Sequence, residues 1–342
     1  MTAAFTDYER LVEAHRVELH DHCYRMLGSV HDADDALQET LLRAWRGVRA
    51  LRNPGAARGW LYSIATNVCL TELERRRRRV LPHDLSPVAE EGTPPGLPVA
   101  ESTWIEPHPF GPEAVVGLRE GIELAFIAAL QHLPPNQRAV LILRDVLGFS
   151  AEETAGLLDA SIASVTSALQ RARTSVRKRV PTQTQQANLA ALGDDGLREL
   201  VERWVSAWES NDVDAMVSML AADATFAMPP LSTWYTPRRL IETWARTYSM
   251  SGDWHWKGLP TWANAQPAVA FYAWDDDAGA HLPFALNVLS VNADGRVRDV
   301  TAFIVRSTDS RQPSAYSNFP TQPMNERRLE GTFARFGLPE QA

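Results

Sequence analysis

The sequence has little of several features, and each shortage excludes a class of protein. It has only two cysteines in 342 residues, Cys23 and Cys69, and their spacing fits neither a disulfide framework nor a metal site. Both lie in helical patterns, so we expect buried free thiols. The longest apolar runs, such as residues 125–130, are too short to span a membrane. The N-terminus carries charges where a secretion signal needs an apolar run, which predicts a cytoplasmic protein with no membrane partner.

Positive charge is scarce overall but concentrated locally. The formal net charge is -8. Residues 38–80 nevertheless hold ten arginines against three acidic residues, and five of these arginines are consecutive at 75–79. From Asp194 onward, nineteen acidic residues stand against thirteen basic ones, a net charge of -6. This asymmetry predicts an N-terminal part that binds a polyanion and an acidic C-terminal part.

The length and the local patterns predict a multidomain chain. Helical periodicity covers most of residues 5–80 and then stops at a stretch with seven prolines, which predicts an extended, mobile linker. Helical patterns resume until a polar PTQTQQ segment. One amphipathic helix and the strand-like segments ATFAMPP, AVAFYAW, FALNVLSV and VRDVTAFIV follow. The predicted parts are an all-α domain (1–80), a linker (81–111), a second all-α domain (112–180), a linker (181–193), an α+β domain (194–306) and a tail (307–342).

Residues 150–178 have the pattern of a helix-turn-helix. We expect Ser150 to cap the first helix, Glu153 to complete a capping box, and residues 159–161 to form the turn. The apolar stripe expected to be buried in the second helix is Ile162, Val165, Leu169, Ala172 and Val176. The polar residues left outside suit base edges and phosphates in a DNA major groove, and they are Ser164, Thr166, Ser167, Gln170, Arg171 and Arg173. A solvated helix with a basic face is the alternative.

The stretch WLYSIATNVCLTELERRRRR, residues 60–79, combines aromatic residues with arginines. The expected buried stripe is Leu61, Ile64, Ala65 and Val68. The side chains left nearer solvent are Trp60, Tyr62, Ser63, Thr66 and Asn67. Aromatic rings in a positive field suit the stacking of unpaired bases. A helix that starts at Trp60 and ends in a solvated arginine run explains the stretch equally well.

The residues before this stretch favour the first interpretation. HDADDALQETLLRAWR, residues 31–46, followed by RGWLYSIATNVCLTELERRRRR, closely resembles region 2 of bacterial extracytoplasmic-function (ECF) sigma factors. LQHLPPNQRAVLILRDVLGFSAEETAGLL and the helix after it resemble region 4 of that family. LRELVERWVSAWESNDVDAMVSMLAADATFAMPP resembles the opening of SnoaL-like domains of the NTF2-like superfamily. The resemblance implies all-α regions 2 and 4, the latter with the helix-turn-helix, and an α+β cone around a pocket.

The resemblance also implies partners and contact residues. The implied partners are core RNA polymerase, at its clamp coiled coil and its flap, and promoter DNA. The implied polymerase contacts are Asp34, Asp35, Gln38, Glu39, Arg43 and Arg46. The implied contacts to the melted −10 element are Asn53, Arg58, Trp60 and Asn67, and the outer face of the region 4 helix is expected to bind the −35 element. For the polymerase set, an ordinary amphipathic helix of mixed charge is the alternative.

Eight of the eleven tryptophans lie beyond residue 200. They fit an aromatic small-molecule pocket or a simple core equally well, so a ligand in the cone is one further partner to test. The candidate pocket residues are Trp208, Trp234, Trp244, Trp274 and His281. Enzymes of the superfamily place an acid or histidine in the cone, and Asp253, His255 and His281 are the candidates here. No pair has a spacing that forces a catalytic arrangement, so we expect no catalytic residue, metal or cofactor.

These observations predict an alternative sigma factor that binds core polymerase, recognises and opens promoters, and is controlled by its own SnoaL-like domain. Trp104 is expected to anchor the linker on a folded surface, and Phe333 and Phe336 to dock on the protein. A one-component helix-turn-helix regulator with a ligand-sensing cone is one alternative, although it leaves residues 31–79 unexplained. A DNA-binding module fused to a SnoaL-type cyclase or isomerase is another.

Overall fold

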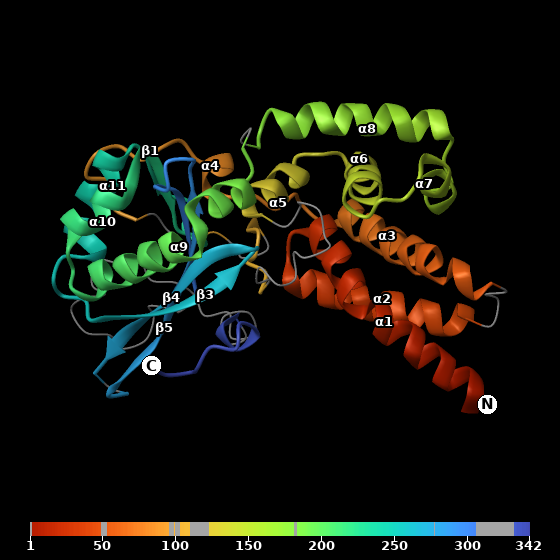
Figure 1. The fold of residues 1–342 in the computed structure, drawn as a ribbon, viewed down its shortest axis with the longest axis horizontal. Coiled ribbons are helices and arrows are strands. Elements are labelled where there is room, and N and C mark those ends of the chain that lie inside the picture. The colour runs from red at the N-terminus through yellow and green to blue at the C-terminus, as the bar shows by residue number, and fades with distance from the viewer. Residues whose placement is uncertain are drawn as a thin grey trace. The chain divides into compact units, whose positions relative to one another are not determined.

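The computed structural model describes residues 2–48, 53–95, 99, 103–109, 123–180, 183–276, 278–305 and 332–342 (Figure 1). The chain divides into two compact units. Unit one joins Met1–Arg79 to Gly117–Thr182, and unit two joins Val80–Val116 to Gln183–Ala342. Each unit is therefore built from two segments that are distant in the sequence.

Three long helices form the first half of unit one, and they are α1 (Thr2–Leu27), α2 (Val30–Gly47) and α3 (Ala57–Arg75). The chain turns after α1 at Gly28, whose φ of +71° favours glycine. Ser29 then caps α2, because its hydroxyl oxygen accepts a hydrogen bond from the Asp32 backbone N–H at 3.1 Å. Cys23 and Cys69 are buried and free, as predicted. The all-α prediction for this half is confirmed.

The buried face of α3 is broader than the sequence pattern predicts. Tyr62 and Thr66, expected nearer solvent, are fully buried. Thr66 Oγ1 lies 2.9 Å from Nε2 of His22 on α1, and the Tyr62 hydroxyl donates to a Glu18 carboxylate oxygen at 3.3 Å. Periodicity places polar residues outside because it does not reveal that a neighbouring helix satisfies their hydrogen bonds.

The second half of unit one contains shorter helices, and they are α5 (Leu124–Gln131), α6 (Pro135–Leu141), the π-helical turn η5 (Ile142–Val146), α7 (Ala151–Leu157) and α8 (Ile162–Arg177). α7 and α8 form the predicted helix-turn-helix. The Ser150 hydroxyl accepts from the Glu153 N–H at 3.1 Å, and the Ser150 N–H donates to the Glu153 carboxylate at 2.6 Å, which confirms the capping box. The prediction for Ile162 is wrong, because this side chain is 47% exposed while the rest of its stripe is buried.

Unit two contains the predicted α+β domain, with a six-stranded sheet in the order β2-β1-β6-β5-β4-β3. β1 and β6 pair in parallel, and every other neighbouring pair is antiparallel. The strands are β1 (Leu220–Ala227), β2 (Trp234–Tyr235), β3 (Trp256–Ala263), β4 (Gln266–Asp275), β5 (Ala280–Val291) and β6 (Val297–Ile304). The four predicted strand segments fall on β1, β4, β5 and β6. The sequence analysis did not predict β3, because this strand contains Gly258 and Pro260, which are uncommon in strands.

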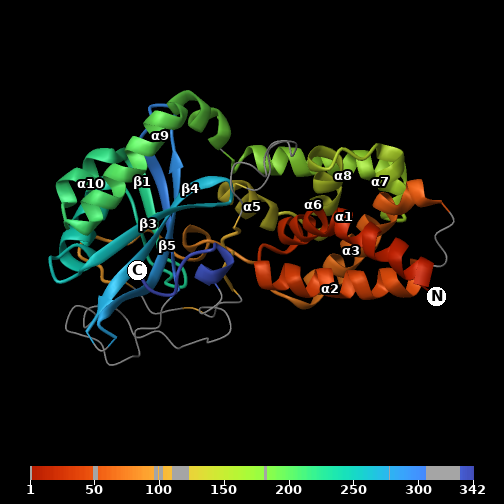
Figure 2. The ribbon, with the colours of Figure 1, turned by 60° about the horizontal axis from the view of Figure 1, so that its bottom comes forward.

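The helices of unit two are α9 (Gln185–Glu209), α10 (Val213–Met219), α11 (Arg238–Trp244) and the π-helical turn η6 (Ala245–Ser249). α9 packs along the sheet (Figure 2), and a Cβ on Gly258 of β3 would lie only 3.0 Å from Cγ1 of Val205 on α9. This close approach explains the glycine within the strand. The predicted second linker, residues 181–193, is largely helical instead, because α9 begins at Gln185 and only kinks at Gly193.

The first linker, predicted to be extended and mobile, differs most from expectation. Its described residues belong to unit two, and they include the short helix α4 (Pro82–Leu85). Ala89 is part of the hydrophobic core of the α+β domain, and Val80 pairs with Trp104 in a parallel β-bridge. Trp104 is 3% exposed, which agrees with its predicted anchoring role. Prolines lack a backbone donor and resist helix and sheet, but they do not prevent a segment from packing on a neighbouring surface.

The end of the predicted tail packs on β4. The Phe333 ring meets the Tyr272 ring edge-on with centroids 5.1 Å apart, and the Tyr272 hydroxyl donates to the Pro339 carbonyl at 2.9 Å. Phe333 is buried as predicted, and Phe336 is half-buried. The rest of the predicted tail, residues 307–331, lies outside the described residues. No described helix is long and apolar enough to cross a membrane.

Candidate functional site

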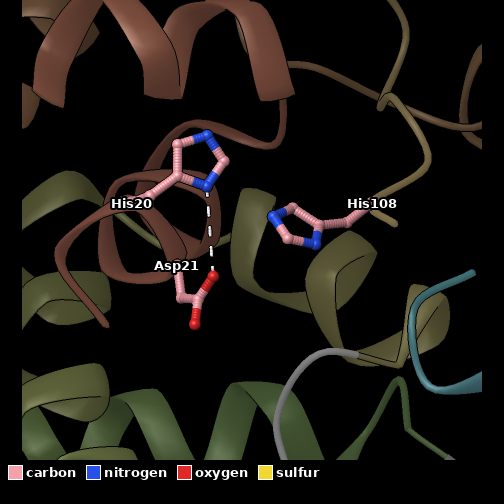
Figure 3. Close-up of side chains that lie close together, drawn as sticks. All are labelled: His20, Asp21 and His108. Carbon is pink, nitrogen blue, oxygen red and sulfur yellow. Dashed lines mark ion pairs between the residues drawn. The ribbon is translucent and has the colours of Figure 1, made fainter. Parts of the chain in front are cut away.

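The candidate polymerase contacts lie on α2, where all six are exposed or half-buried: Asp34, Asp35, Gln38, Glu39, Arg43 and Arg46. Two of these acids have local partners. Asp34 Oδ1 lies 3.1 Å from His20 Nε2, and Glu39 Oε1 accepts from Arg43 Nε at 2.7 Å. The other ring nitrogen of His20 lies 3.9 Å from the Asp21 carboxylate (Figure 3), and burial raises the pKa of Asp21. The structure therefore brings the predicted set together on one accessible helix.

A groove of about 320 Å³ separates α2 from α3. Its charged lining mixes both signs and includes Asp35, Glu39 and Arg43 from α2 with Glu72 and Arg75 from α3. α2 also exposes two large apolar side chains, Leu42 at 52% and Trp45 at 45%. Sequence reasoning missed this pair. Exposed apolar side chains among charged ones are typical of a protein-binding surface.

The five consecutive arginines do not form one solvated run. Arg79 is only 4% exposed, and its Nε and Nη2 donate to Asp32 Oδ2 at 3.1 and 2.6 Å. Arg76 pairs with the same carboxylate and with Glu72. Arg75, Arg76, Arg77 and Arg78 are all exposed, so Arg79 is the buried member of the run. Part of the positive run is therefore structural, because Arg76 and Arg79 join the segment after α3 to the first turn of α2.

The four candidate −10 contacts separate into exposed and covered residues. Asn53 and Asn67 are exposed, and Asn53 Oδ1 accepts from the Gly55 N–H at 2.9 Å. Trp60 is half-buried with its ring against the end of α2, where a Cβ on Gly47 would lie 3.1 Å from Cζ2. Arg58 is half-buried as well, but it faces region 4.

Arg58 links α3 to the segment between η5 and α7. Its Nη2 donates to the Leu147 carbonyl at 3.2 Å. Its guanidinium carbon lies 4.5 Å from the centre of the Phe149 ring and 5.1 Å from that of Tyr62. These two rings also meet edge-on, with centroids 5.4 Å apart. The arginine therefore makes a cation–π contact with Phe149, between η5 and α7.

Further contacts join regions 2 and 4 within unit one. The Ser63 hydroxyl on α3 donates to the Leu157 carbonyl at the end of α7 at 3.0 Å. Arg138 on α6 is 3% exposed and donates to the Met26 carbonyl at the end of α1. Burial lowers the pKa of Arg138 to about 10, so the guanidinium remains charged at neutral pH. Part of the candidate −10 surface of α3 is therefore covered by the helix-turn-helix.

The candidate −35 contacts are all exposed on α8: Ser164, Thr166, Ser167, Gln170, Arg171 and Arg173. Ser161 caps this helix by accepting from the Ser164 N–H at 3.1 Å. Arg173 is held by a bidentate pair with Asp145, at 2.6 and 2.8 Å. The structure thus assembles the predicted set on one helix, although Arg173 already has a carboxylate partner.

A small cavity lies inside the α+β domain. Its volume is about 20 Å³, which is room for roughly one water molecule. Trp208 and Trp244 line it, as predicted. The other lining residues are Phe226, Met228, Ser249, Trp256, Phe271, Phe284, Ala285, Asn287, Ala302 and Ile304. None of these side chains is an acid, a base or a histidine, so the lining offers no group for acid–base catalysis.

The other three candidate pocket residues do not line this cavity. The Trp234 indole N–H donates to the Ser86 carbonyl at 2.9 Å, on the packed linker. Trp274 and His281 are register partners on β4 and β5, and their rings contact each other with centroids 5.2 Å apart. Burial lowers the pKa of His281. Composition alone does not reveal which tryptophans face the interior of the cone, so a pocket role for these three residues stays a prediction.

Three polar groups among the lining residues lack a hydrogen-bond partner within the described part of the chain. They are the indole Nε1 atoms of Trp208 and Trp244 and the hydroxyl oxygen of Ser249. Each of these residues is less than 5% exposed, at 4%, 3% and 4%. An unpaired buried donor costs about 1–3 kcal/mol. The surface that the cavity exposes is apolar, so these three groups are buried beside the cavity rather than directed into it.

We call the described residues within 80–109 the linker strap, because hydrogen bonds hold them to the α+β domain. The Tyr235 hydroxyl donates to the Thr93 carbonyl at 2.9 Å. Further along, the His108 N–H donates to Asn264 Oδ1 at 3.0 Å, and the Asn264 N–H donates to the His108 carbonyl at 2.8 Å. Asn264 is fully buried in the turn between β3 and β4. The strap is therefore fixed at several points along its length.

Family models match three parts of the chain: Sigma-70 region 2 at residues 11–79, Sigma-70 region 4 at residues 123–176, and the SnoaL-like domain at residues 201–300. The ECF RNA polymerase sigma factor SigG of Mycobacterium tuberculosis is 42% identical over 308 residues, which cover 87% of this chain and 81% of SigG. SigJ of the same organism is 29% identical over 214 residues, covering 63% of this chain and 62% of SigJ. The crystal structure of SigJ superposes with a TM-score of 0.54 at 21% identity, covering 93% of this chain and 100% of that one.

Regions 2 and 4 together define a transcription initiation factor of the sigma-70 class. The chain belongs to the ECF RNA polymerase sigma factors, and it carries a fused SnoaL-like domain. The predicted multidomain fold, with two all-α regions followed by an α+β cone, is confirmed. So is the predicted function as an alternative sigma factor.

Proposed function

We propose that this sigma factor is held in a closed form by its own structure and that core RNA polymerase opens it. In the open form, the α2 set binds the clamp coiled coil, region 4 meets the flap, α3 binds the melted −10 element, and α8 binds the −35 element. The observation that carries the proposal is the position of Arg58. This side chain, expected to contact −10 DNA, lies 4.5 Å from the centre of the Phe149 ring of region 4. One guanidinium cannot make both contacts.

The linker strap supports a regulatory role for the SnoaL-like domain. A free linker of thirty-one residues, 81–111, would span roughly 95 Å in polyproline geometry, which is ample for separating regions 2 and 4. That length is reduced while the strap is held to the domain at Thr93 and His108. We infer that the domain controls the sigma regions by holding the linker short, and that opening requires release of at least part of the strap.

We further infer that the cone cavity receives a neutral, apolar occupant. The absence of charge among the lining residues and the apolar surface that they expose support this. A volume of about 20 Å³ admits a water-sized occupant, and a larger ligand requires aromatic rings to move. Because no acid or histidine lines the cavity, we propose that the domain senses or stabilises rather than catalyses.

Run-off transcription with core polymerase tests the regulatory proposal. A chain truncated after Val180 lacks the partner of the strap, so we expect more transcript from it than from the full chain at limiting core polymerase. Circular dichroism and core-binding measurements establish that folding and affinity are matched. Less transcript from the truncated chain would reject inhibition and favour a positive role for the domain. A one-component regulator, or a DNA-binding module fused to a cyclase or isomerase, would yield no transcript from either chain.

Arg58→Lys tests the closed form separately. Lysine keeps the positive charge but loses the planar fork that stacks on Phe149 and bonds the Leu147 carbonyl. We expect faster amide hydrogen exchange in α7 of the full chain without polymerase. Arg77→Lys, at an exposed arginine outside this contact, is the matched control. Unchanged exchange in α7 of the Arg58 variant would contradict the closed form.

A further inference from the structure

Ile162 is an exposed apolar residue that does not belong to the hydrophobic core of region 4. It is the first residue of α8 and is 47% exposed, whereas Val165 and Leu169 behind it are buried. Among the described residues of region 4, no other large apolar side chain is exposed to this extent. In helix-turn-helix proteins, the start of the second helix is the part that contacts base edges. Ile162 is exposed at this position, so its side chain is placed where it can contact DNA.

The first two turns of α8 offer two chemically different surfaces. Ile162 and Thr166 are one turn apart and share a side of the helix. The Thr166 hydroxyl donates to the Ile162 carbonyl at 2.9 Å, so its proton is used and this side offers mainly carbon atoms. The polar side chains spaced three and four residues apart on another side are Ser164, Ser167 and Arg171, all exposed. The helix thus has an apolar edge beside a polar face.

The major groove of DNA presents one apolar group, the C5-methyl of thymine, and apolar side chains recognise it. We propose that Ile162 is a specificity-determining residue that packs against the C5-methyl of a thymine in the −35 element. This inference rests on the proposed role of α8 in binding that element. The contact would bury the exposed side chain and select thymine at one position. Hydrogen bonds from the serines and Arg171 alone do not recognise the methyl group of thymine.

The test removes the methyl group without changing base pairing. The probe is a duplex that the holoenzyme, formed from the full chain and core polymerase, selects from a randomised pool. Each thymine of its −35 element is replaced in turn by deoxyuridine, and the Kd is measured for the wild type, Ile162→Ala and Ile162→Leu. Burial of one methyl group corresponds to roughly a fourfold change in Kd. The wild type is expected to lose about that factor at one thymine, Ile162→Leu to lose part of it, and Ile162→Ala to show no loss there.

Val17→Ala is the matched control, because Val17 is an exposed aliphatic residue on α1, at 66% exposure, outside the helix-turn-helix. This variant is expected to keep the wild-type response to deoxyuridine. If the selected duplex binds but deoxyuridine affects the wild type and Ile162→Ala equally at every position, Ile162 does not recognise a thymine methyl. If the holoenzyme selects no −35 sequence, the proposed DNA-binding role of α8 fails, and this inference fails with it.

Discussion

Asp32 and Arg79 form a buried ion pair across 47 positions of sequence, with Arg79 Nη2 2.6 Å from Asp32 Oδ2 and each residue 4% exposed. Asp32 lies in the first turn of α2, and Arg79 is the last residue of region 2 before the linker strap. The pair therefore holds the end of the arginine run against the start of α2 within unit one.

The first prediction concerns this pair. Asp32→Ala leaves the Arg79 guanidinium buried without its carboxylate, so we expect the free energy of unfolding of unit one to fall by about 3–5 kcal/mol. Urea unfolding followed by circular dichroism measures it. Glu39→Ala, which breaks the exposed pair with Arg43, is the control and is expected to cost less than about 1 kcal/mol. Equal costs for the two variants would show that the buried pair has no special structural role.

The second prediction concerns the polymerase interface. Asp35→Arg combined with Gln38→Ala should abolish binding to core polymerase without loss of fold, because both side chains are exposed on α2. Gel filtration of the mixture with core polymerase measures holoenzyme formation. Asp195→Arg, at a side chain 92% exposed on α9, is the charge-matched control and should leave holoenzyme intact. Holoenzyme formation by the double variant would reject α2 as the docking helix.

The third prediction separates the two DNA surfaces. Arg171→Ala should weaken binding to a double-stranded −35 element and reduce the salt dependence by roughly one counterion, because Arg171 is exposed on α8. Trp60→Ala should instead reduce promoter melting, with duplex affinity nearly unchanged. Filter binding over a salt series and permanganate reactivity near −10 measure the two effects. Identical phenotypes would contradict a division of labour between α8 and α3.

The fourth prediction concerns pH. Burial, helped by the positive charge of Arg25, lowers the pKa of His22 from 6.5 to about 3. Between these values the unfolded chain binds a proton that the folded chain does not, so the free energy of unfolding falls as the pH falls. Between pH 7 and pH 5, His22 should account for a loss of about 2 kcal/mol. Urea unfolding at both pH values should show a correspondingly smaller difference in His22→Gln, and an unchanged difference would reject the assignment.

The fifth prediction concerns the cone cavity. Ser249→Ala removes a buried hydroxyl that lacks a partner, so in protein shown by native mass spectrometry to be empty we expect the free energy of unfolding to rise by about 1 kcal/mol. Thr247→Ala, at an exposed residue of the same turn, is the control. A loss of stability in the empty Ser249 variant would indicate that the hydroxyl already has a partner.

Local signals made the helix-turn-helix predictable. The capping box joins Ser150 to Glu153, three positions apart, and Ser161 caps α8. Helical periodicity likewise placed the α8 set on exposed faces, whereas the α2 set came from the resemblance to region 2 of the sigma factors. Periodicity places Ile162 in the buried stripe, but it does not show that the first turn of α8 extends beyond the core.

Contacts between distant residues were not predictable. The linker strap bonds to Tyr235 and Trp234 across 142 and 148 positions, and no local pattern in a proline-rich segment indicates such partners. The sequence of α3 alone does not reveal the hydrogen bond between Arg58 and the Leu147 carbonyl, because the two residues are 89 positions apart. The identity of the cavity-lining tryptophans depended in the same way on how the sheet and its helices come together.

The linker strap is synthesised before the surface that binds it. It is synthesised before region 4, but the strands and turns that bind it are encoded after Gln183. At ordinary rates of translation, the residues from Gln183 to Ala342 take roughly 10–30 s to emerge. During that interval both sigma regions exist while the strap has no surface to bind. Under the proposed regulation, each newly made molecule passes through a period in which polymerase can capture it before the strap is bound.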